Sequence, residues 1–386
     1  MQLVAYGAQD IYLTGNPQIT FFKVVYRRHT NFAMEAIEQT WNGTSSNSDG
    51  RCTATISRNG DLVHKMYLEL TLGAEGVGTG VVNPGSRFIT SVELEIGGQK
   101  IDKQSGQWME TWAQLSEPNP NGAVCDMEQL ARGGGTLFQS MSGMGGVDTI
   151  THLTSGEVLT IPLQFWFCRN PGLALPLIAL QYHEVKVILE HTAGTHIASS
   201  ATTNKLWCDY IYLDTDERRR FAQVSHEYLI EQVQEQSLTG VGSGADLNFN
   251  HPVKELVWHV LPATKTVSSV PLAGSWQLKL NGHDRFAARD FRYFTRTQVW
   301  QHHTGAGGLD ATCTAGGAVG NHNDSIGVYS FALKPEEHQP SGTCNFSRID
   351  NAQLTSGGGS AAVTVYAVNY NVLRIMSGMG GLAYSN

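Results

Sequence analysis

The sequence predicts an all-β protein made of two similar antiparallel β-sandwiches in tandem, and three observations support this. Charged residues make up only 16% of the 386 residues while glycine occurs 42 times, a balance that favours turns and short strands over long helices. Apolar and polar residues alternate in several segments, as in half-buried strands. Finally, three patterns of the first half recur in the same order in the second half.

The alternation is clearest in two segments of the first half. The stretch "MYLELTL", residues 66–72, places its Met and Leu side chains on one face. In "VELEIGG" the apolar residues Val92, Leu94 and Ile96 share a face and are followed by Gly97-Gly98. Because glycine accepts positive φ, this pair predicts a tight hairpin.

The duplication rests on three pairs of segments. "ELEIGGQKID" resembles "QLKLNGHDRF", in which the alternation again runs into a hairpin pair, Asn281-Gly282. "NGDLVHKMYLEL" resembles "NHPVKELVWHVL", and "FWFCRNPGLALP" resembles "YSFALKPEEHQP". Each match is weak alone, but their common order predicts a duplicated domain.

One helix is expected, in "SGQWMETWAQL". Trp108, Trp112 and Leu115 have helical spacing there, behind the candidate N-cap Ser105. The glycine-rich stretches "GGGTLFQSMSGMGG" and "HHTGAGGLDATCTAGGAVGNHND" have no periodicity and are expected to be surface loops.

The chain is longer than one core usually supports, which favours two domains. The polar, charged stretch "LDTDERRRFAQ" is interpreted as a linker at residues 214–224, between a first roll at 22–213 and a second at 225–386. Residues 1–21 precede the first roll as an N-terminal segment.

The segment "ITFFKVVYRRHTNF" combines aromatic and basic residues in the manner of a nucleic-acid-binding surface. The whole chain, however, has 26 Lys and Arg against 34 Asp and Glu, a net charge of -8. Phosphate would therefore meet net repulsion, and no direct nucleic-acid partner is expected.

The cysteine pattern and the N-terminus predict free thiols in a reducing compartment. The six cysteines are scattered without a CxxC pair, and "MQLVAYGAQD" lacks the charged start and apolar core of a signal peptide. No apolar run approaches the roughly 18 residues that mark a membrane span.

The search for chemistry predicts no enzyme, metal or cofactor. His183-Glu184 and His226-Glu227 resemble the start of HExxH, but the second histidine is missing from each. His302-His303 is adjacent, so in a strand its two rings would point to opposite faces. Neither GxxxxGK[ST] nor GxSxG occurs.

Two further features remain open at this level. The hexapeptide "MSGMGG" occurs at 141–146 and at 376–381, either by coincidence in a glycine-rich chain or as a contact element, since Met adapts to irregular apolar surfaces. Sequons occur at Asn42, Asn323 and Asn345. They are interpreted as ordinary asparagines, and Asn323 is the best of the three candidates for glycosylation.

A series of long motifs spread over nearly the whole chain resembles a known family. They include "YGAQDIYLTGNPQITFFKVVYRRHTNFA", "LEIGGQKID", "NPGLALPLIALQYHEVK", "DYIYLDTDERRRFAQ", "QPSGTCNFSRIDNA" and "NYNVLRIMSGMGGLAY". Together these segments resemble the major capsid proteins of nucleocytoplasmic large DNA viruses, most of all those of the algal, chlorella-virus branch.

The resemblance implies a double jelly roll, two eight-stranded antiparallel sandwiches in tandem with a few short helices in loops. It further implies a homotrimer of pseudo-hexagonal outline that tiles an icosahedral virion shell, assembled in the host cytoplasm. The implied partners are neighbouring capsomers, minor capsid proteins, surface glycans and, indirectly, an internal viral membrane.

The resemblance also implies roles for particular segments. The stretch holding "GNPQITFFK" lies at the capsomer base, so that its aromatic residues pack on the rolls or on a neighbouring chain and its basic residues meet acidic partners. The residues concerned are Phe21, Phe22, Lys23, Tyr26, Arg27 and Arg28. The alternative is that the aromatics belong to the first core. Arg218, Arg219 and Arg220 would lie in the linker, and 302–325 would form an outer loop.

Three rival readings remain open. The chain would be a minor capsid paralogue if it occupied special positions of the shell, and residues 119–159 match the family poorly. A carbohydrate-binding jelly roll requires an exposed platform built from Trp276, Trp300 or Tyr293. A cupin-like enzyme requires a bound metal.

Overall fold

The computed structural model describes most of the chain. The described residues are 29–46, 48–73, 83–118, 136–147, 156–192, 203–260, 271–305, 307–308, 324–358 and 362–384, together with residues 8, 9, 16 and 22 of the N-terminal stretch. Among them, no helix is long and apolar enough to cross a membrane.

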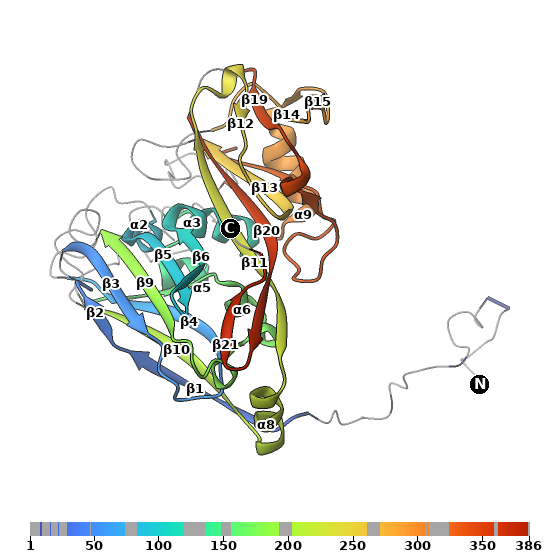
Figure 1. Cartoon of the computed structure of the whole chain (residues 1–386). Helices are drawn as coiled ribbons and strands as arrows, with labels where there is room; N and C mark the ends of the chain where they lie inside the picture. Colours follow the sequence, from blue (N-terminus) through green and yellow to red (C-terminus); the bar gives the residue numbers. More distant parts are fainter. Residues whose placement is uncertain are drawn as a thin grey trace, which may run out of the picture.

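The first half forms two antiparallel sheets that enclose one core (Figure 1). One sheet has the order β1 (Phe32–Gln39), β10 (Thr203–Leu213), β4 (Leu62–Thr71) and β7 (Val158–Pro162), with β8 (Leu175–Pro176) also paired to β4. The other has the order β2 (Trp41–Gly43), β3 (Asp49–Thr55), β9 (Val185–Thr192), β5 (Ile89–Ile96) and β6 (Gln99–Ser105).

The second half repeats this plan. Its larger sheet has the order β11 (His226–Leu238), β20 (Val363–Met376), β13 (Pro252–Val260) and β17 (Ile326–Ser330), with β18 (Cys344–Asn345) on β13 and β21 (Met379–Leu382) on β20. The other sheet has the order β12 (Ala245–Asp246), β19 (Ala352–Ser356), β14 (Ser275–Leu280) and β15 (His283–Asp284), with β16 (Arg289–Asp290) on β14.

The strand orders of the two halves correspond one to one. The order β1-β10-β4-β7 becomes β11-β20-β13-β17, and β3-β9-β5-β6 becomes β12-β19-β14-β15. The three sequence matches fall on similar places: on β4 and β13, on the hairpins β5–β6 and β14–β15, and in the segments that follow β7 and that begin at the end of β17. The eight corresponding strands of each half confirm the predicted pair of jelly rolls, to which the first half adds β2 and β8 and the second half adds β16, β18 and β21.

The predicted strand details are confirmed as well. The apolar face of β4 is buried, and Val92, Leu94 and Ile96 of β5 are fully buried. Gly97 and Gly98 both have positive φ, 58° and 83°, as a two-residue hairpin of this twist requires. The turn Asn281-Gly282 of the second half has φ of 53° and 73°.

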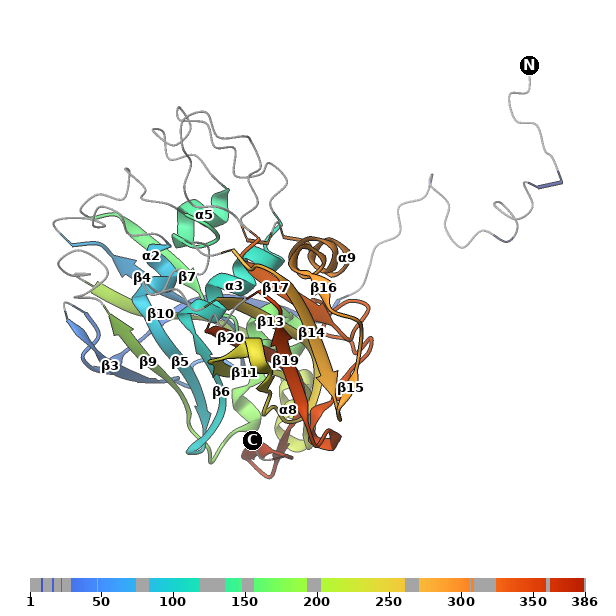
Figure 2. The same cartoon turned by 90° about the horizontal axis from the view of Figure 1, so that it is seen from above.

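Short helices occupy the connections. They are α2 (Pro84–Phe88), α3 (Gly106–Ser116), α5 (Leu137–Ser142), α6 (Trp166–Arg169), α8 (Thr215–Gln223) and α9 (Gln298–His302), with the single turns η1 (Pro171–Leu173), η2 (Leu177–Ala179), η3 (Val241–Ser243) and η5 (Phe346–Arg348) and the π-helical η4 (Tyr293–Thr297). Figure 2 shows α3 beside α9 where the two sandwiches meet. The expected linker is thus largely helical, because α8 covers most of it.

Two long strands of the second sandwich, β11 and β20, extend along the first sandwich. The strands β11 and β20 pair over their whole common length, from His226 opposite Ile375 to Leu238 opposite Val363. In Figure 1 both run from the second sandwich down along the first. Accordingly, Ile230, Leu373 and Ile375 belong to the core of the first half. The halves are joined by buried surface and not only by α8.

The cysteines within the described part of the chain are reduced. Cys52, Cys168 and Cys208 are buried, Cys344 is partly buried, and all four are free thiols. This agrees with the prediction for these four, while Cys125 and Cys313 lie outside the described residues.

Candidate functional site: the junction of the two sandwiches

Helix α3 forms the centre of the junction. Its N-cap is Ser105, whose hydroxyl accepts a hydrogen bond from the Trp108 amide at 3.3 Å, as the sequence predicted. The face formed by Trp108, Trp112 and Leu115 is buried, but against the second half rather than its own core. It packs on an apolar cluster made of Val257, Val299, Ile326, Val328, Tyr366 and Val368.

The C-terminal end of α3 is bound by the chain that follows α9. The amide of Gly305 donates to the carbonyl oxygen of Leu115 at 2.7 Å, and that of Gly307 to Gln114 at 2.8 Å. The Thr304 hydroxyl donates to the Ser116 carbonyl at 2.9 Å. Carbonyls that the helix itself cannot satisfy are thus capped by the other sandwich.

A buried ionic cluster lies on the side of the junction next to β11. Glu231 on β11 meets Arg169 of α6 at 2.9 Å and Lys254 of β13 at 2.8 Å, and His338 lies 3.5 Å away. Burial opposes ionisation of Glu231, but the hydrogen bond to His338 and the charges of Lys254 and Arg169 outweigh it and lower its pKa to about 2. Arg169 also lies over the Trp112 ring at 4.3 Å.

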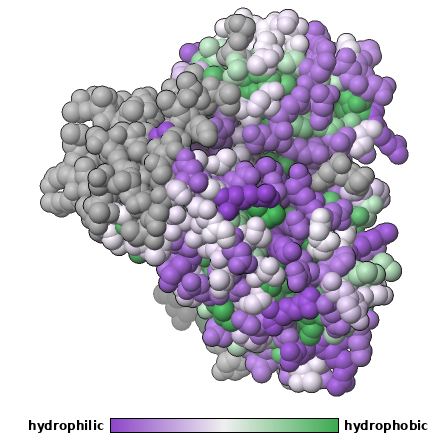
Figure 3. Space-filling view, turned by 60° about the vertical axis from the view of Figure 1, so that its left-hand side comes forward, coloured by the Kyte–Doolittle hydropathy of each residue, from purple (hydrophilic) through white to green (hydrophobic). Residues whose placement is uncertain are grey.

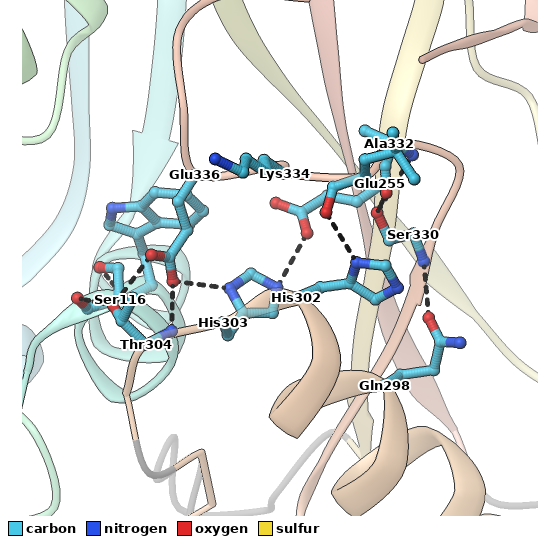
Figure 4. A network of polar contacts seen from close by, with 12 residues as sticks. Ser116, Glu255, Gln298, His302, His303, Thr304, Ser330, Ala332, Lys334 and Glu336 are labelled. Atoms are coloured by element: carbon cyan, nitrogen blue, oxygen red, sulfur yellow. Dashed lines mark hydrogen bonds and ion pairs between the residues drawn. The ribbon is translucent and has the colours of Figure 1, made fainter. Parts of the chain in front are cut away.

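A second ionic cluster surrounds His303 (Figure 4). Its Nε2 lies 3.0 Å from Oε2 of Glu255 on β13, and its Nδ1 lies 3.0 Å from Oε1 of Glu336. Burial opposes protonation, but the two carboxylates outweigh it and raise the pKa of His303 to about 9. The Trp112 ring meets the imidazole edge-on, with centroids 6.3 Å apart.

Strand β11 also bonds directly to the edge strand β6. The side-chain amide of Gln232 donates to the carbonyl oxygen of Ile101, and the Val233 amide donates to Oδ1 of Asp102 at 3.2 Å. Burial raises the pKa of Asp102 to about 6, although the hydrogen bonds from the Val233 amide and the Gln104 side chain oppose the rise. The two sandwiches are therefore joined at several independent points.

The two copies of "MSGMGG" have different structures. The first ends α5 and continues through Gly145 and Gly146, whose amides donate to the buried carboxylate of Glu110 at 2.9–3.1 Å. The second forms the turn between β20 and β21, where the Gly378 carbonyl accepts from the Tyr182 amide at 2.9 Å. The repeat is thus not a repeated structural element.

A polar cleft runs beside the junction. It has a volume of about 780 Å³ and lies between the outer face of β5 and β6 and the strand β11. Its lining includes Lys103, Glu190, Gln234, Gln236 and Phe249. The molecular face shown in Figure 3 is predominantly hydrophilic, with hydrophobic residues exposed only in small separate areas.

The N-terminal site residues fall mostly outside the described part of the chain. Of the six predicted residues only Phe22 is described, and its side chain is fully exposed. Whether the aromatic group packs on the first core or on a neighbouring chain stays a prediction. Phe21, Lys23, Tyr26, Arg27 and Arg28 are not among the described residues.

The predicted linker arginines lie on the exposed helix α8. Arg218 pairs with the buried Asp61 at 2.8 Å, which ties α8 to the first sandwich. Arg219 and Arg220 are exposed. Asp214 starts the helix and accepts from the Thr215 amide at 2.8 Å.

Two of the three sequon asparagines are exposed. Asn42 and Asn345 are exposed on β2 and β18, whereas Asn323 lies outside the described residues.

The sites required by the rival functions are not assembled in the described residues. Of the three residues of the carbohydrate platform, Trp276 is buried in the second core and only Trp300 is widely exposed. Within the described residues no group of three or more potential metal ligands occurs. From the sequence we considered His302-His303 in a strand, but His302 ends α9 and His303 is the C-cap of that helix.

The residues that join the sandwiches were missed by sequence reasoning. Lys254, Glu255 and Glu231 lie in strands, where charged residues are ordinarily interpreted as a solvent face. The one available signal was "PVKELVWHV", in which charges interrupt a run too apolar for a half-exposed strand. Its strand β13 is in fact buried along nearly its whole length.

Comparison with solved structures defines the class of protein. The chain matches the capsid protein in a quasi-atomic model of the PBCV-1 virus capsid with a TM-score of 0.77 and 36% identity, over 95% of this chain and 100% of that one. The mavirus major capsid protein shares only the fold, with a TM-score of 0.50 and 11% identity over 100% of this chain and 97% of that one. The tandem sandwiches are those of double jelly-roll viral capsid proteins.

Sequence comparison gives the family. A model of the major capsid protein N-terminus matches residues 20–214, and a model of the large eukaryotic DNA virus major capsid protein matches residues 217–381. The major capsid proteins of Pyramimonas orientalis virus and Paramecium bursaria Chlorella virus 1 are 52% and 40% identical to the chain, each over 100% of this chain and 99% of the relative. The chain belongs to the major capsid proteins of large eukaryotic DNA viruses. It is a structural, non-enzymatic protein of the virion capsid.

Proposed function

We propose that three copies of this chain form a capsomer of pseudo-hexagonal outline that tiles the faces of an icosahedral shell. The observation that carries this proposal is the one-to-one correspondence of strand order between the two halves. Three copies then present six similar sandwiches, so that an object with three-fold symmetry offers nearly equivalent contacts to six neighbours. Each contact between capsomers can be weak, because many act together in the lattice.

The junction supports this proposal mechanically. Six sandwiches keep a hexagonal outline only if the two in each chain hold a fixed mutual orientation. The apolar packing of α3, the capped α3 carbonyls and the ion pair of Arg169 with Glu231 all act across the junction. The ion pairs of His303 lie within the second sandwich and hold the segment that caps α3. Buried ion pairs are better at fixing one arrangement than at adding stability, which suits this role.

We further propose that residues 22–213 and 225–386 act as the two rolls, joined through 214–224, with residues 1–21 as a separate N-terminal segment. The strands of the first two sheets span Phe32 to Leu213 and those of the other two span His226 to Leu382, in support of this division. In the capsomer, Arg218 anchors the connection to the first roll through Asp61.

The stretch at residues 21–28, where the N-terminal segment leads into the first roll, is proposed as the docking element at the capsomer base. Phe22 is fully exposed in the single chain, and a large exposed aromatic side chain is typical of a surface that another chain covers. Phe21 and Tyr26 extend this contact, while Lys23, Arg27 and Arg28 meet acidic groups of the partner.

The other partners follow from the same role. Capsomers contact neighbouring capsomers and minor capsid proteins, and through these an internal viral membrane, and assembly takes place in the host cytoplasm. The exposed Asn42 and Asn345 are the described candidates for surface glycans, although the Asn345 side chain already accepts from the Ser347 amide at 3.0 Å.

The oligomeric state in solution tests the proposal. The monomer mass is 42.1 kDa, so light scattering of the purified protein should give three times this value. A protein that stays monomeric over a wide range of salt, pH and concentration would contradict self-assembly into trimers.

A further inference from the structure

The imidazole of His303 is held between two carboxylates and must carry a proton in this arrangement. Its Nε2 faces Glu255 and its Nδ1 faces Glu336, both at 3.0 Å. Because ionised carboxylates only accept hydrogen bonds, both ring nitrogens have to donate, which requires the imidazolium form. A neutral ring could donate to one of the two carboxylates and would turn a lone pair towards the other.

The two carboxylates beside the His303 ring favour its protonated form, and the charged groups of every element packed against it are as follows. From β13 come Glu255, which is completely buried, and Lys254, which pairs with Glu231 at 2.8 Å. From the segment after β17 comes Glu336, and from α3 come the Trp112 edge and Glu117, whose pKa is raised by burial and by Glu336. Three further basic side chains lie nearby, and each has its own partner. Arg169 lies over the Trp112 ring, and Lys334 pairs with Glu337. The His302 imidazole bonds the Leu333 carbonyl.

The same cluster fixes the segment that caps α3. Glu336 accepts a hydrogen bond from the amide of Thr304 at 2.9 Å, and its Oε2 lies 2.9 Å from the Thr304 hydroxyl, whose single proton it shares with the Ser116 carbonyl oxygen. The Thr304 hydroxyl also lies 2.9 Å from the Ser116 carbonyl oxygen, and the amides of Gly305 and Gly307 donate to α3. Figure 4 shows the chain from Glu255 through His303 and Glu336 to Ser116. The positions of Thr304, Gly305 and Gly307 therefore depend on how His303 and Glu336 are held.

We propose that His303 is a proton-dependent latch between the two sandwiches, which in its protonated form binds Glu255 and Glu336 and so keeps Thr304, Gly305 and Gly307 on the end of α3. Loss of the proton leaves the buried carboxylate of Glu255 and the partly exposed carboxylate of Glu336 facing a neutral ring, and the cap on α3 loosens. The latch acts within one chain and goes beyond the proposed assembly, so it can be tested whether or not trimers form.

The sign of the pH dependence follows from the direction of the pKa shift. The pKa of His303 is raised from an ordinary value of 6.5 to about 9, so the folded chain binds this proton more tightly than the unfolded chain. The stabilisation is complete below pH 6.5 and is lost as the pH rises towards about 9. Protons can reach the cluster because Glu336 lines an open cleft of about 460 Å³.

The test compares His303→Gln with the matched control His302→Gln, using urea unfolding of the full chain at pH 6.5, 8.0 and 9.5 and one protein concentration. Glutamine can still donate one hydrogen bond but cannot titrate. At pH 6.5 the unfolding equilibrium constant of His303→Gln should exceed that of the wild type by at least about tenfold, and this ratio should shrink towards one at pH 9.5. The control should follow the wild type throughout.

A ratio between His303→Gln and the wild type that stays constant over this pH range would overturn the latch. Other groups that titrate in the same range act equally in both proteins and cancel in the ratio. Should His303→Gln fail to fold, Glu336→Gln serves instead, since the Glu336 side chain is 20% exposed. This variant should move the loss of stability to lower pH, and an unchanged pH profile would equally contradict the proposal.

Discussion

Trp108 of the first sandwich and Tyr366 of the second lie with their ring centroids 5.1 Å apart, and both side chains are completely buried. Trp108 sits on α3 and Tyr366 on the long strand β20. This buried aromatic contact of the junction thus connects two elements far apart in sequence. Because both rings belong to one buried apolar cluster, their packing fixes how the two sandwiches are oriented relative to each other.

Replacing Trp108 by alanine should therefore destabilise the whole chain and not one roll. Loss of a buried Trp side chain in a packed core costs about 3–5 kcal/mol. The measurement is the free energy of unfolding from a urea titration. Trp300→Ala is the matched control, because that side chain is 82% exposed, and it should change the value by less than about 0.5 kcal/mol. Equal effects of the two substitutions would show that the junction adds nothing.

Replacing Glu231 by glutamine should destabilise the chain and weaken its sensitivity to acid. The change leaves Arg169 and Lys254 without their shared carboxylate, and breaking a buried ion pair costs about 3–5 kcal/mol. In the wild type the pKa of Glu231 is lowered from 4.5 to about 2, so its stabilisation is present above pH 4.5 and is lost as the pH falls towards 2.

Urea unfolding at pH 7, 4.5 and 3 checks this prediction. The difference between wild type and Glu231→Gln should be largest at pH 7 and should shrink at pH 3. The control is Glu227→Gln on the same strand, where a pair with Arg374 is more than half exposed and is worth at most about 1 kcal/mol. A difference that grows on acidification would refute the assigned direction.

Replacing Glu110 by alanine should release the loop that carries the first "MSGMGG". The carboxylate accepts the amides of Gly145 and Gly146, and Gly146 keeps Asn83 as a second acceptor. The Gly145 amide loses its acceptor, and a buried amide in that state costs about 1–3 kcal/mol. Limited proteolysis should then cleave faster within residues 136–147. Glu93→Ala, which removes only a partly exposed pair with Lys103, should leave this rate unchanged.

Replacing Phe22 by serine should weaken trimers without affecting the fold of the single chain. The side chain is fully exposed, so the unfolding free energy of the monomer should stay within about 0.5 kcal/mol. Light scattering over a dilution series would show dissociation at a higher concentration than in the wild type. Leu333→Ser, which also removes a widely exposed apolar side chain, is the control. Identical dissociation of all three proteins would remove the docking role of Phe22.

The sequence predicted those elements whose information is local. The alternating faces of β4 and β5, the hairpins at Gly97-Gly98 and Asn281-Gly282 and the Ser105 cap of α3 each depend on a few neighbouring residues. Even the duplication was detectable, because hairpin glycines and strand alternation fall at equivalent positions in both halves.

The remaining features depend on residues distant in sequence. The apolar face of α3 was recognised, but nothing local shows that it packs on the other half of the chain. The charges of β13 are buried only because β13 lies between the second core and the junction. Likewise nothing local in His302-His303 shows that the pair lies at the end of a helix, where His303 faces carboxylates and His302 bonds the Leu333 carbonyl. Identical "MSGMGG" segments fold differently because one meets Glu110 and the other continues β20.

Single-particle electron microscopy of the purified assembly tests the central claim most directly. The account predicts class averages with three-fold symmetry and a pseudo-hexagonal outline, in which six similar lobes correspond to two sandwiches from each of three chains. Averages that show only isolated two-lobed particles, or rings whose number of lobes is not six, would contradict the proposal that the duplicated sandwich makes a three-fold capsomer fit a hexagonal lattice.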